Sequence, residues 1–190
     1  ENYESDQKPE CITQRFALEK GVAVSKDIHY GTVLAADTVV TLDNAIMGKP
    51  RTTIEAKNML RQLKGRIHSV ITGLAWIDIK SGFSKTEFHK TTVQMRKYTD
   101  QEISRFIATG SPFDKAGGYA IQDPKFSPAR KIIGCYTNVV GLPLCAVLKF
   151  LAKSTSLRTS PLLMDLWTSN PNQTGETLDS TCKGCEILIK

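Results

Sequence analysis

Short apolar runs and alternating apolar residues mark four segments of the chain as β-strands. The first is rich in small and β-branched residues, so we expect it to be buried and to end at Asp37. The second and third flank Ser81-Gly82, a pair typical of a turn, and together they predict a hairpin. The four predicted strands cover residues 32–37, 67–79, 87–96 and 130–135.

Apolar residues spaced three and four apart predict four helices, two of which carry capping signals. Thr52 and Glu55 have the spacing of a capping box, and the same spacing recurs at Thr99 and Glu102. We expect the first helix to end at Gly21, because glycine commonly follows the last turn of a helix. Three of the predicted helices cover residues 9–20, 52–65 and 99–110. The fourth begins at Gly141. The buried stripe of the second helix is expected to be Ile54, Met59, Leu60 and Leu63.

Strands and helices interleave along the chain, which predicts an α/β domain with a mixed sheet. A chain of 190 residues is long enough for one domain with a sizeable core. Polar residues and proline dominate after Lys153. We therefore expect residues 1–153 to form the domain and residues 154–190 to be a weakly ordered tail.

Composition narrows the class of ligand and the compartment. The net charge of +6 and the pI of about 9.1 favour an anionic ligand, phosphates included. Basic residues are not interleaved with aromatics, so we predict no nucleic-acid partner. No apolar stretch is long enough for a membrane span, and no secretory signal pattern opens the sequence. Irregularly spaced cysteines, with one C-x-x-C pair at Cys182 and Cys185, favour a reducing cytoplasm over a disulfide framework or a zinc site.

Asp37 is the first candidate for chemistry, because a carboxylate at the exit of a buried strand is costly unless it binds a cation or a proton. Lys49 follows in the segment Met47-Gly48-Lys49-Pro50. An acid and a base at this spacing suggest a ligand that carries both a metal and phosphates. The alternative interpretation of Asp37 is an N-cap or a turn aspartate.

The segment from Asp114 to Gln122 is the second candidate, since it combines two charges, two adjacent glycines and an amide. Adjacent glycines let the backbone approach a ligand closely and expose N–H groups to anions. Together with Asp37 and Lys49, this segment provides a set of groups suited to a nucleoside triphosphate.

These segments resemble the Maf family, also called septum-formation inhibitor proteins, which are nucleoside triphosphate pyrophosphatases. The resemblance covers residues 9–152, and the order and spacing of the motifs make it specific. The matching motifs are Pro9 to Lys20, Ala36-Asp37-Thr38-Val39-Val40, Gly48-Lys49-Pro50, Met59-Leu60 to Gly65 with His68, Thr72-Gly73, Asp114 to Gln122, and Asn138 to Leu144.

The resemblance implies a fold like that of inosine triphosphate pyrophosphatases, an elongated mixed sheet flanked by helices with a cleft between two lobes. It also implies hydrolysis of dTTP and UTP, a divalent cation such as Mg²⁺, Mn²⁺ or Co²⁺, and a homodimer. The branch of the family that acts on these pyrimidine nucleotides is indicated by Thr38, Asp114, Lys115 and Gln122.

The same resemblance assigns roles to single residues. Asp37 is expected to be the general base and a metal ligand, and Glu1, with Glu4 as runner-up, a further metal ligand. Thr38 and Gln122 occupy positions associated with substrate choice. The lysines expected to bind phosphate are Lys20, Lys49 and Lys115.

Two of the matched residues have structural alternatives. Lys20 would complement the helix dipole if the helix ends at Gly21, so this interpretation and phosphate binding are both open. His68 is expected to be a hydrogen-bonded structural histidine rather than a catalytic one.

The chain departs from the family at its start, because the family's first strand and its Ser-x-Arg-Arg loop precede the matched region. This departure leaves a second hypothesis open, a catalytically impaired nucleotide-binding protein with a regulatory role in cell division.

Overall fold

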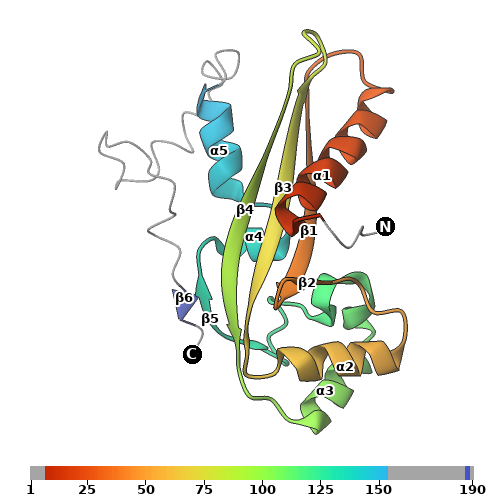
Figure 1. Cartoon of the computed structure of the whole chain (residues 1–190), viewed down its shortest axis with the longest axis vertical. Coiled ribbons are helices and arrows are strands. Elements are labelled where there is room, and N and C mark those ends of the chain that lie inside the picture. The colour runs from red at the N-terminus through yellow and green to blue at the C-terminus, as the bar shows by residue number, and fades with distance from the viewer. Residues whose placement is uncertain (1–6, 154–186, 189–190) are drawn as a thin grey trace.

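The computed structural model describes residues 7–153 and 187–188, and these form one elongated sheet with helices packed on it (Figure 1). The sheet has the strand order β2-β1-β3-β4-β5-β6. Its strands are β1 (Thr32–Leu42), β2 (Ala45–Met47), β3 (Ile67–Asp78), β4 (Ser84–Met95), β5 (Ala129–Ile133) and β6 (Ile187–Leu188). The α-helices are α1 (Pro9–Ser25), α2 (Thr53–Leu63), α3 (Asp100–Ile107), α4 (Tyr136–Val140) and α5 (Leu144–Lys153).

The α/β architecture agrees with the prediction, but every pairing between the described strands is antiparallel rather than mixed. Short turns account for two of these pairings. Asp43 and Asn44 join β1 to β2 with φ values of 50° and 66°, a conformation that these two residue types tolerate in tight hairpins. The predicted turn at Ser81-Gly82 joins β3 to β4.

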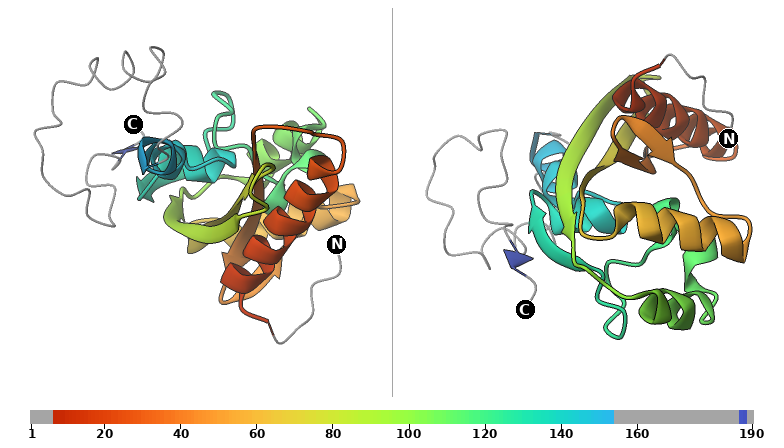
Figure 2. Two further views of the ribbon diagram at one scale, coloured as in Figure 1. Left: turned by 90° about the horizontal axis from the view of Figure 1, so that it is seen from above. Right: turned by 60° about the horizontal axis from the view of Figure 1, so that its bottom comes forward.

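The helices lie on both faces of the sheet (Figure 2). α1 packs on β1 and β3, whereas α4 and α5 lie on the opposite face. There Trp76 of β3 stacks on Phe150 of α5 with ring centroids 3.8 Å apart, so Trp76 packs in the core. A larger core surrounds α2 and α3 at the other end of the sheet; its fully buried members include Leu60, Leu63, Val93, Tyr98, Ile103 and Ile132.

Helix α1 does not end at Gly21, as the sequence suggested, but continues to Ser25. A Cβ at Gly21 would lie 2.9 Å from Cδ1 of Ile77, and one at Gly73 would lie 2.3 Å from the backbone of Thr13. Both glycines therefore allow α1 to pack unusually close to the sheet. Gly21 is a packing residue, and the misinterpretation arose because its contact partner lies far along the sequence.

The capping signals of α2 and α3 were interpreted correctly. Thr52 accepts a hydrogen bond from the backbone N–H of Glu55, at 3.1 Å. At α3 both halves of the capping box form between Thr99 and Glu102. One predicted buried residue is wrong, because Ile54 in the first turn of α2 is 72% exposed. Ala56, Leu60 and Leu63 are the residues that α2 buries.

Two further predictions concern the ends of elements. Strand β1 does not end at Asp37 but runs on to Leu42, because the residues after Asp37 are again apolar or β-branched. Most of the predicted tail, residues 154–190, lies outside the described residues, so its weak order stays a prediction. Within it, Ile187 and Leu188 pair with β5.

Candidate functional site

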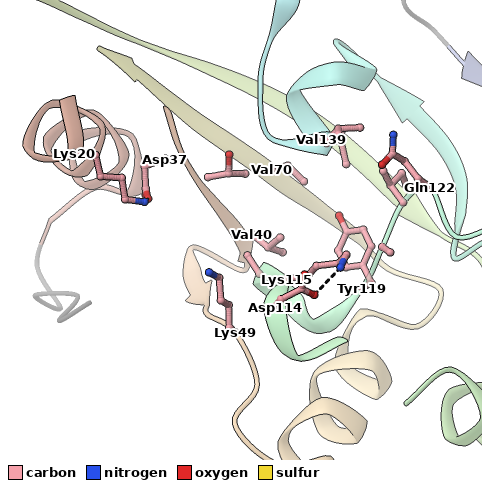
Figure 3. A pocket seen from close by; sticks show the side chains of 15 residues that line it. Lys20, Asp37, Val40, Lys49, Val70, Asp114, Lys115, Tyr119, Gln122 and Val139 are labelled. Carbon is pink, nitrogen blue, oxygen red and sulfur yellow. Dashed lines mark hydrogen bonds and ion pairs between the residues drawn. The ribbon is translucent and has the colours of Figure 1, made fainter. Parts of the chain in front are cut away.

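A pocket of about 270 Å³ gathers the predicted site residues from α1, β1, the segment after β2 and the segment 114–122 (Figure 3). Every predicted site residue in the described part of the chain lines it, whereas Glu1 lies outside that part. The lining residues are Lys20, Asp37, Thr38, Val40, Lys49, Val70, Asp114, Lys115, Ala116, Tyr119, Ala120, Ile121, Gln122, Val139 and Val140.

Asp37 lies in the middle of β1, opposite Gly73 of β3, and is only 5% exposed. Lys20 of α1 forms an ion pair with its Oδ1. Burying a carboxylate is costly, and this pair offsets part of the cost. Because Asp37 lies inside a strand, it is neither an N-cap nor a turn residue.

The position of Lys20 follows from the packing of α1. The helix extends beyond Lys20 to Ser25, so Lys20 is not in its last turn and does not complement the helix dipole as the alternative proposed. The close approach that Gly73 and Gly21 allow instead brings its ammonium group to the buried carboxylate.

A backbone hydrogen bond ties the segment 114–122 to the residue before Lys49. The N–H of Gly117 donates to the carbonyl oxygen of Gly48, at 2.9 Å. Gly117 and Gly118 have φ values of 69° and 67°, a conformation that favours glycine. A Cβ at Gly117 would also lie 3.1 Å from Cγ1 of Val40. The paired glycines are therefore required by both conformation and space.

Lys115 lines the pocket and is paired with a neighbouring carboxylate. Its Nζ lies 2.6 Å from Oδ1 of Asp114 and 3.2 Å from the carbonyl oxygen of Ser111. The hydrogen bond from Lys115 lowers the pKa of Asp114, so this carboxyl is ionised near neutral pH. The Asp114 side chain is 74% exposed, in contrast to that of Asp37.

Thr38 belongs to a polar network that ties the pocket to α4. Its Oγ1 lies 2.8 Å from Oγ1 of Thr72, and Thr72 donates to the carbonyl oxygen of Asn138 at 3.3 Å. Asn138 is fully buried, and its Nδ2 donates to Oγ1 of Thr91 at 3.0 Å. The network holds α4 on the sheet, and with it the pocket residue Val139. Sequence reasoning gave Asn138 no role, although it lies within a matched motif.

Tyr119 is a pocket residue that sequence reasoning missed. Its hydroxyl oxygen lies 2.7 Å from Nε2 of His68, which is 3% exposed on β3. The expectation that His68 is hydrogen-bonded is confirmed, and the structure adds that the residue is buried. Burial lowers the pKa of His68 to about 4, so the ring is neutral at physiological pH. A tyrosine directly after two glycines was the one sequence signal that could have drawn attention to it.

Oxygen ligands for a divalent cation are present but sparse. The described residues contain no group of three or more His, Cys, Asp or Glu side chains placed to hold a metal. Asp37 and Asp114 are the carboxylates that line the pocket. Mg²⁺ is commonly bound by one or two carboxylates together with water and substrate phosphates, so this donor set fits such an ion.

The pocket is lined by lysines, carboxylates and apolar side chains, a combination that suits a ligand with a charged end and a flat, weakly polar end. Lys20, Lys49 and Lys115 can neutralise phosphates, because an ammonium group is a compact point charge. None of the helices among the described residues is long and apolar enough to cross a membrane.

Comparison with known proteins gives a family and close relatives. The family model described as Maf-like protein matches residues 1–154. A relative from Desulfotalea psychrophila is 44% identical over 144 residues, which is 76% of this chain and 74% of the relative. One from Alkaliphilus metalliredigens is 40% identical over 145 residues, 76% of each chain. One from Thermomicrobium roseum is 47% identical over 137 residues, 72% of this chain and 62% of the relative. Each of the three is named dTTP/UTP pyrophosphatase.

Proposed function

The chain belongs to the family of Maf-like proteins, and from this premise we propose that it hydrolyses dTTP and UTP to the nucleoside monophosphate and pyrophosphate. The convergence of one buried carboxylate and three lysines on a single pocket is what most supports this activity. The names of relatives that are 40–47% identical support the choice of substrates.

In the proposed reaction, the oxygen of a water molecule attacks the α-phosphorus, and the bond from that phosphorus to the oxygen bridging the β-phosphate breaks. Pyrophosphate leaves with the electron pair of that bond. Asp37 accepts the proton that the water loses, and the ion pair with Lys20 favours its ionised, proton-accepting form. The protein positions the reactants and neutralises charge, and it supplies no covalent chemistry of its own.

Charge neutralisation is assigned to the lysines. Lys49 and Lys115 would bind the phosphates that leave, and Lys20 would lie closest to the reacting centre because it already contacts Asp37. Backbone N–H groups of the segment 114–122 add donors of fixed geometry.

A divalent cation, when bound, would neutralise phosphate charge and help ionise the attacking water. Asp37 is the ligand that we propose within the described residues, with Glu1 as the further ligand expected from the family resemblance. Mg²⁺, Mn²⁺ and Co²⁺ are the ions to test.

Substrate choice is assigned to the part of the pocket that holds Thr38 and Gln122. The amide of Gln122 carries a donor and an acceptor, and so it can match the polar edge of a pyrimidine. Apolar side chains such as Val139 and Val40 offer surface for the faces of the base. A homodimer and a cytoplasmic location remain predictions.

The activity is tested by measuring pyrophosphate release from dTTP, UTP, ATP and 7-methyl-GTP, each assayed separately in the presence of Mn²⁺. We expect release from the two pyrimidine nucleotides and little from the purine nucleotides. Release from none of the four, while nucleotide still binds, would favour the catalytically impaired nucleotide-binding protein instead.

A further inference from the structure

His68 and Tyr119 form a buried contact whose polar atoms are not fully used by the protein. The rings meet edge to face, with centroids 5.4 Å apart and an interplanar angle of 80°. Tyr119 is 5% exposed and is one of the residues that line the pocket. The contact joins β3 to the segment that carries Lys115 and Gln122, so it links the sheet to the ligand-facing loop.

Both side chains are neutral at pH 7. Burial lowers the pKa of His68 to about 4, and burial also raises the pKa of the Tyr119 hydroxyl above its ordinary value. The imidazole therefore carries one ring proton, and the phenol carries one hydroxyl proton. Only one of these two protons can lie between Nε2 of His68 and the Tyr119 oxygen, which are 2.7 Å apart.

The surroundings of Nδ1 decide which ring nitrogen of His68 is protonated. Nδ1 is buried and has no hydrogen-bond partner in the part of the chain that the structure describes. A proton there would be a buried donor without an acceptor, which costs about 1–3 kcal/mol. Orphaned buried N–H groups are rarer than under-satisfied acceptors. When the pocket supplies an acceptor for the hydroxyl hydrogen of Tyr119, the favoured tautomer carries its proton on Nε2 and donates it to the Tyr119 oxygen.

In this tautomer the hydrogen of the Tyr119 hydroxyl is not used by His68. Among the described residues, His68 is the one hydrogen-bond partner recorded for that oxygen. The hydroxyl hydrogen therefore needs an acceptor, and the pocket is the space where a ligand could supply it. Figure 3 shows Tyr119 on the side of the pocket that also holds Lys115, Gln122 and Val139, away from Lys20 and Asp37.

We propose that Tyr119 donates a hydrogen bond to a carbonyl oxygen of the bound pyrimidine, and that His68 is the positioning residue that holds the Tyr119 oxygen in place. The inference rests on the proposed function, because it takes the base to lie beside Gln122 and the phosphates beside the lysines. Uracil and thymine both present carbonyl oxygens, so the donor serves both substrates.

The first test is the affinity of Tyr119→Phe for a dTTP analogue in which an NH group replaces the oxygen between the α- and β-phosphates. This analogue is not cleaved there, so binding is measured without turnover. We expect the Kd to rise about 3–10-fold, the range for loss of one neutral hydrogen bond. Unchanged affinity would overturn the proposal.

Tyr98→Phe is the matched control. Tyr98 is also fully buried, but its hydroxyl donates to the carbonyl oxygen of Leu60, at 2.7 Å, and does not line the pocket. We expect this variant to lose stability and to keep its affinity for the analogue. Equal weakening by both substitutions would mean that the Tyr119 effect is structural, and would overturn the donor role.

The second test reads the tautomer directly. In ¹⁵N NMR spectra of the wild-type protein with labelled histidine, we expect His68 to show a protonated Nε2 and an unprotonated Nδ1. A proton on Nδ1 would overturn the proposal whatever the affinities are. The assignment uses His68→Gln, which removes the signal; if that variant does not fold, the Tyr119→Phe affinity still decides.

Failure of the inference is distinguishable from failure of the proposed function. If the wild-type protein binds the analogue but releases no pyrophosphate from dTTP or UTP, the proposed hydrolysis is wrong while the donor role can still be measured. If hydrolysis occurs but Tyr119→Phe binds normally, the function stands and the donor role does not.

Discussion

The two walls of the pocket are built in different ways. The sheet wall consists of Asp37 and Thr38 on β1, with Lys20 held over it by α1. The loop wall consists of Lys49 and the segment 114–122, which follows the 3₁₀ turn Ser111–Asp114 and contains a second one, Ala116–Gly118, rather than a strand. A long strand ladder fixes the first wall, whereas single contacts such as Gly117 to Gly48 and His68 to Tyr119 hold the second.

This difference assigns a different task to each wall. The sheet wall holds a carboxylate that is 5% exposed, so a change there disturbs a buried charge. The carboxylate of the loop wall, Asp114, is 74% exposed, and exposed ion pairs contribute little to stability. The proposed proton acceptor thus lies on the wall that the strand ladder fixes, whereas Lys49, Lys115 and Gln122 lie on the wall that fewer contacts hold.

The largest effect is expected at Asp37. Asp37→Asn keeps the size of the side chain and removes the proton acceptor, so turnover should fall by about 10²–10⁴-fold. Affinity for the uncleavable dTTP analogue should change little. Asp27→Asn, at an exposed position outside the pocket, is the control. Rates of pyrophosphate release within a few-fold of wild type would contradict the assigned role.

A comparison of glycines on the two walls should give the next largest effect. Gly73→Ala would place a Cβ 2.3 Å from the backbone of Thr13, which cannot move without shifting α1. We expect a loss of about 3–5 kcal/mol in the free energy of unfolding. Gly117→Ala meets a side chain at 3.1 Å and a φ of 69°, so we expect a smaller loss of about 1–2 kcal/mol.

Urea unfolding measures both glycine variants. The reverse order of their stabilities would mean that the sheet wall is the more adaptable of the two, against the present account.

Much of the framework behind these walls could be predicted from local patterns. The apolar run of β3 and the capping signals at the starts of α2 and α3 depend on residues a few positions apart, and all three elements form as expected. The site residues came from the family resemblance and not from spacing alone. Those in the described part of the chain line one pocket, Glu1 lies outside it, and the roles of all of them stay predictions.

Two of the failures, at Gly21 and Tyr119, involve contacts between segments that are distant in the sequence. Gly21 resembled a helix end because its partner Ile77 could not be known from the neighbouring sequence. The bond between His68 and Tyr119 joins residues 51 positions apart. Ile54 was assigned to the buried stripe of α2 on helical spacing alone, but the helix is rotated so that this residue faces solvent.

The buried contact between His68 and Tyr119 is expected to make the folded protein less stable in acid. The pKa of His68 is about 4 in the folded protein and about 6.5 in an unfolded chain, so over this range the unfolded state binds more protons. Stability contributed at this position is therefore present above pH 6.5 and falls as the pH falls toward 4. Between pH 7 and pH 5 we expect a loss of about 2 kcal/mol.

Urea unfolding of wild type and His68→Gln at both pH values isolates this loss, and His29→Gln at an exposed position is the control. An equal pH dependence in wild type and His68→Gln would contradict the buried, neutral histidine.

The smallest effects on kinetics are expected for the two lysines of the loop wall, and of these Lys115, which is paired with Asp114, should matter less. Lys49→Ala should raise KM and lower kcat together, because phosphate charge is present in both the ground state and the transition state. Lys115→Ala should have a weaker effect of the same kind, since Asp114 already neutralises part of its charge. Steady-state kinetics with dTTP compare the two, and a larger defect in Lys115→Ala would reverse the assigned order.

The orientation of a bound nucleotide tests the division between the walls most directly. We predict that a crystal structure with the uncleavable dTTP analogue and Mg²⁺ places the α-phosphate beside Asp37 and the β- and γ-phosphates beside Lys49 and Lys115. The base should then lie within hydrogen-bonding distance of Gln122 and Tyr119. A base bound beside Lys20 and Asp37, or a nucleotide bound outside this pocket, would contradict the account.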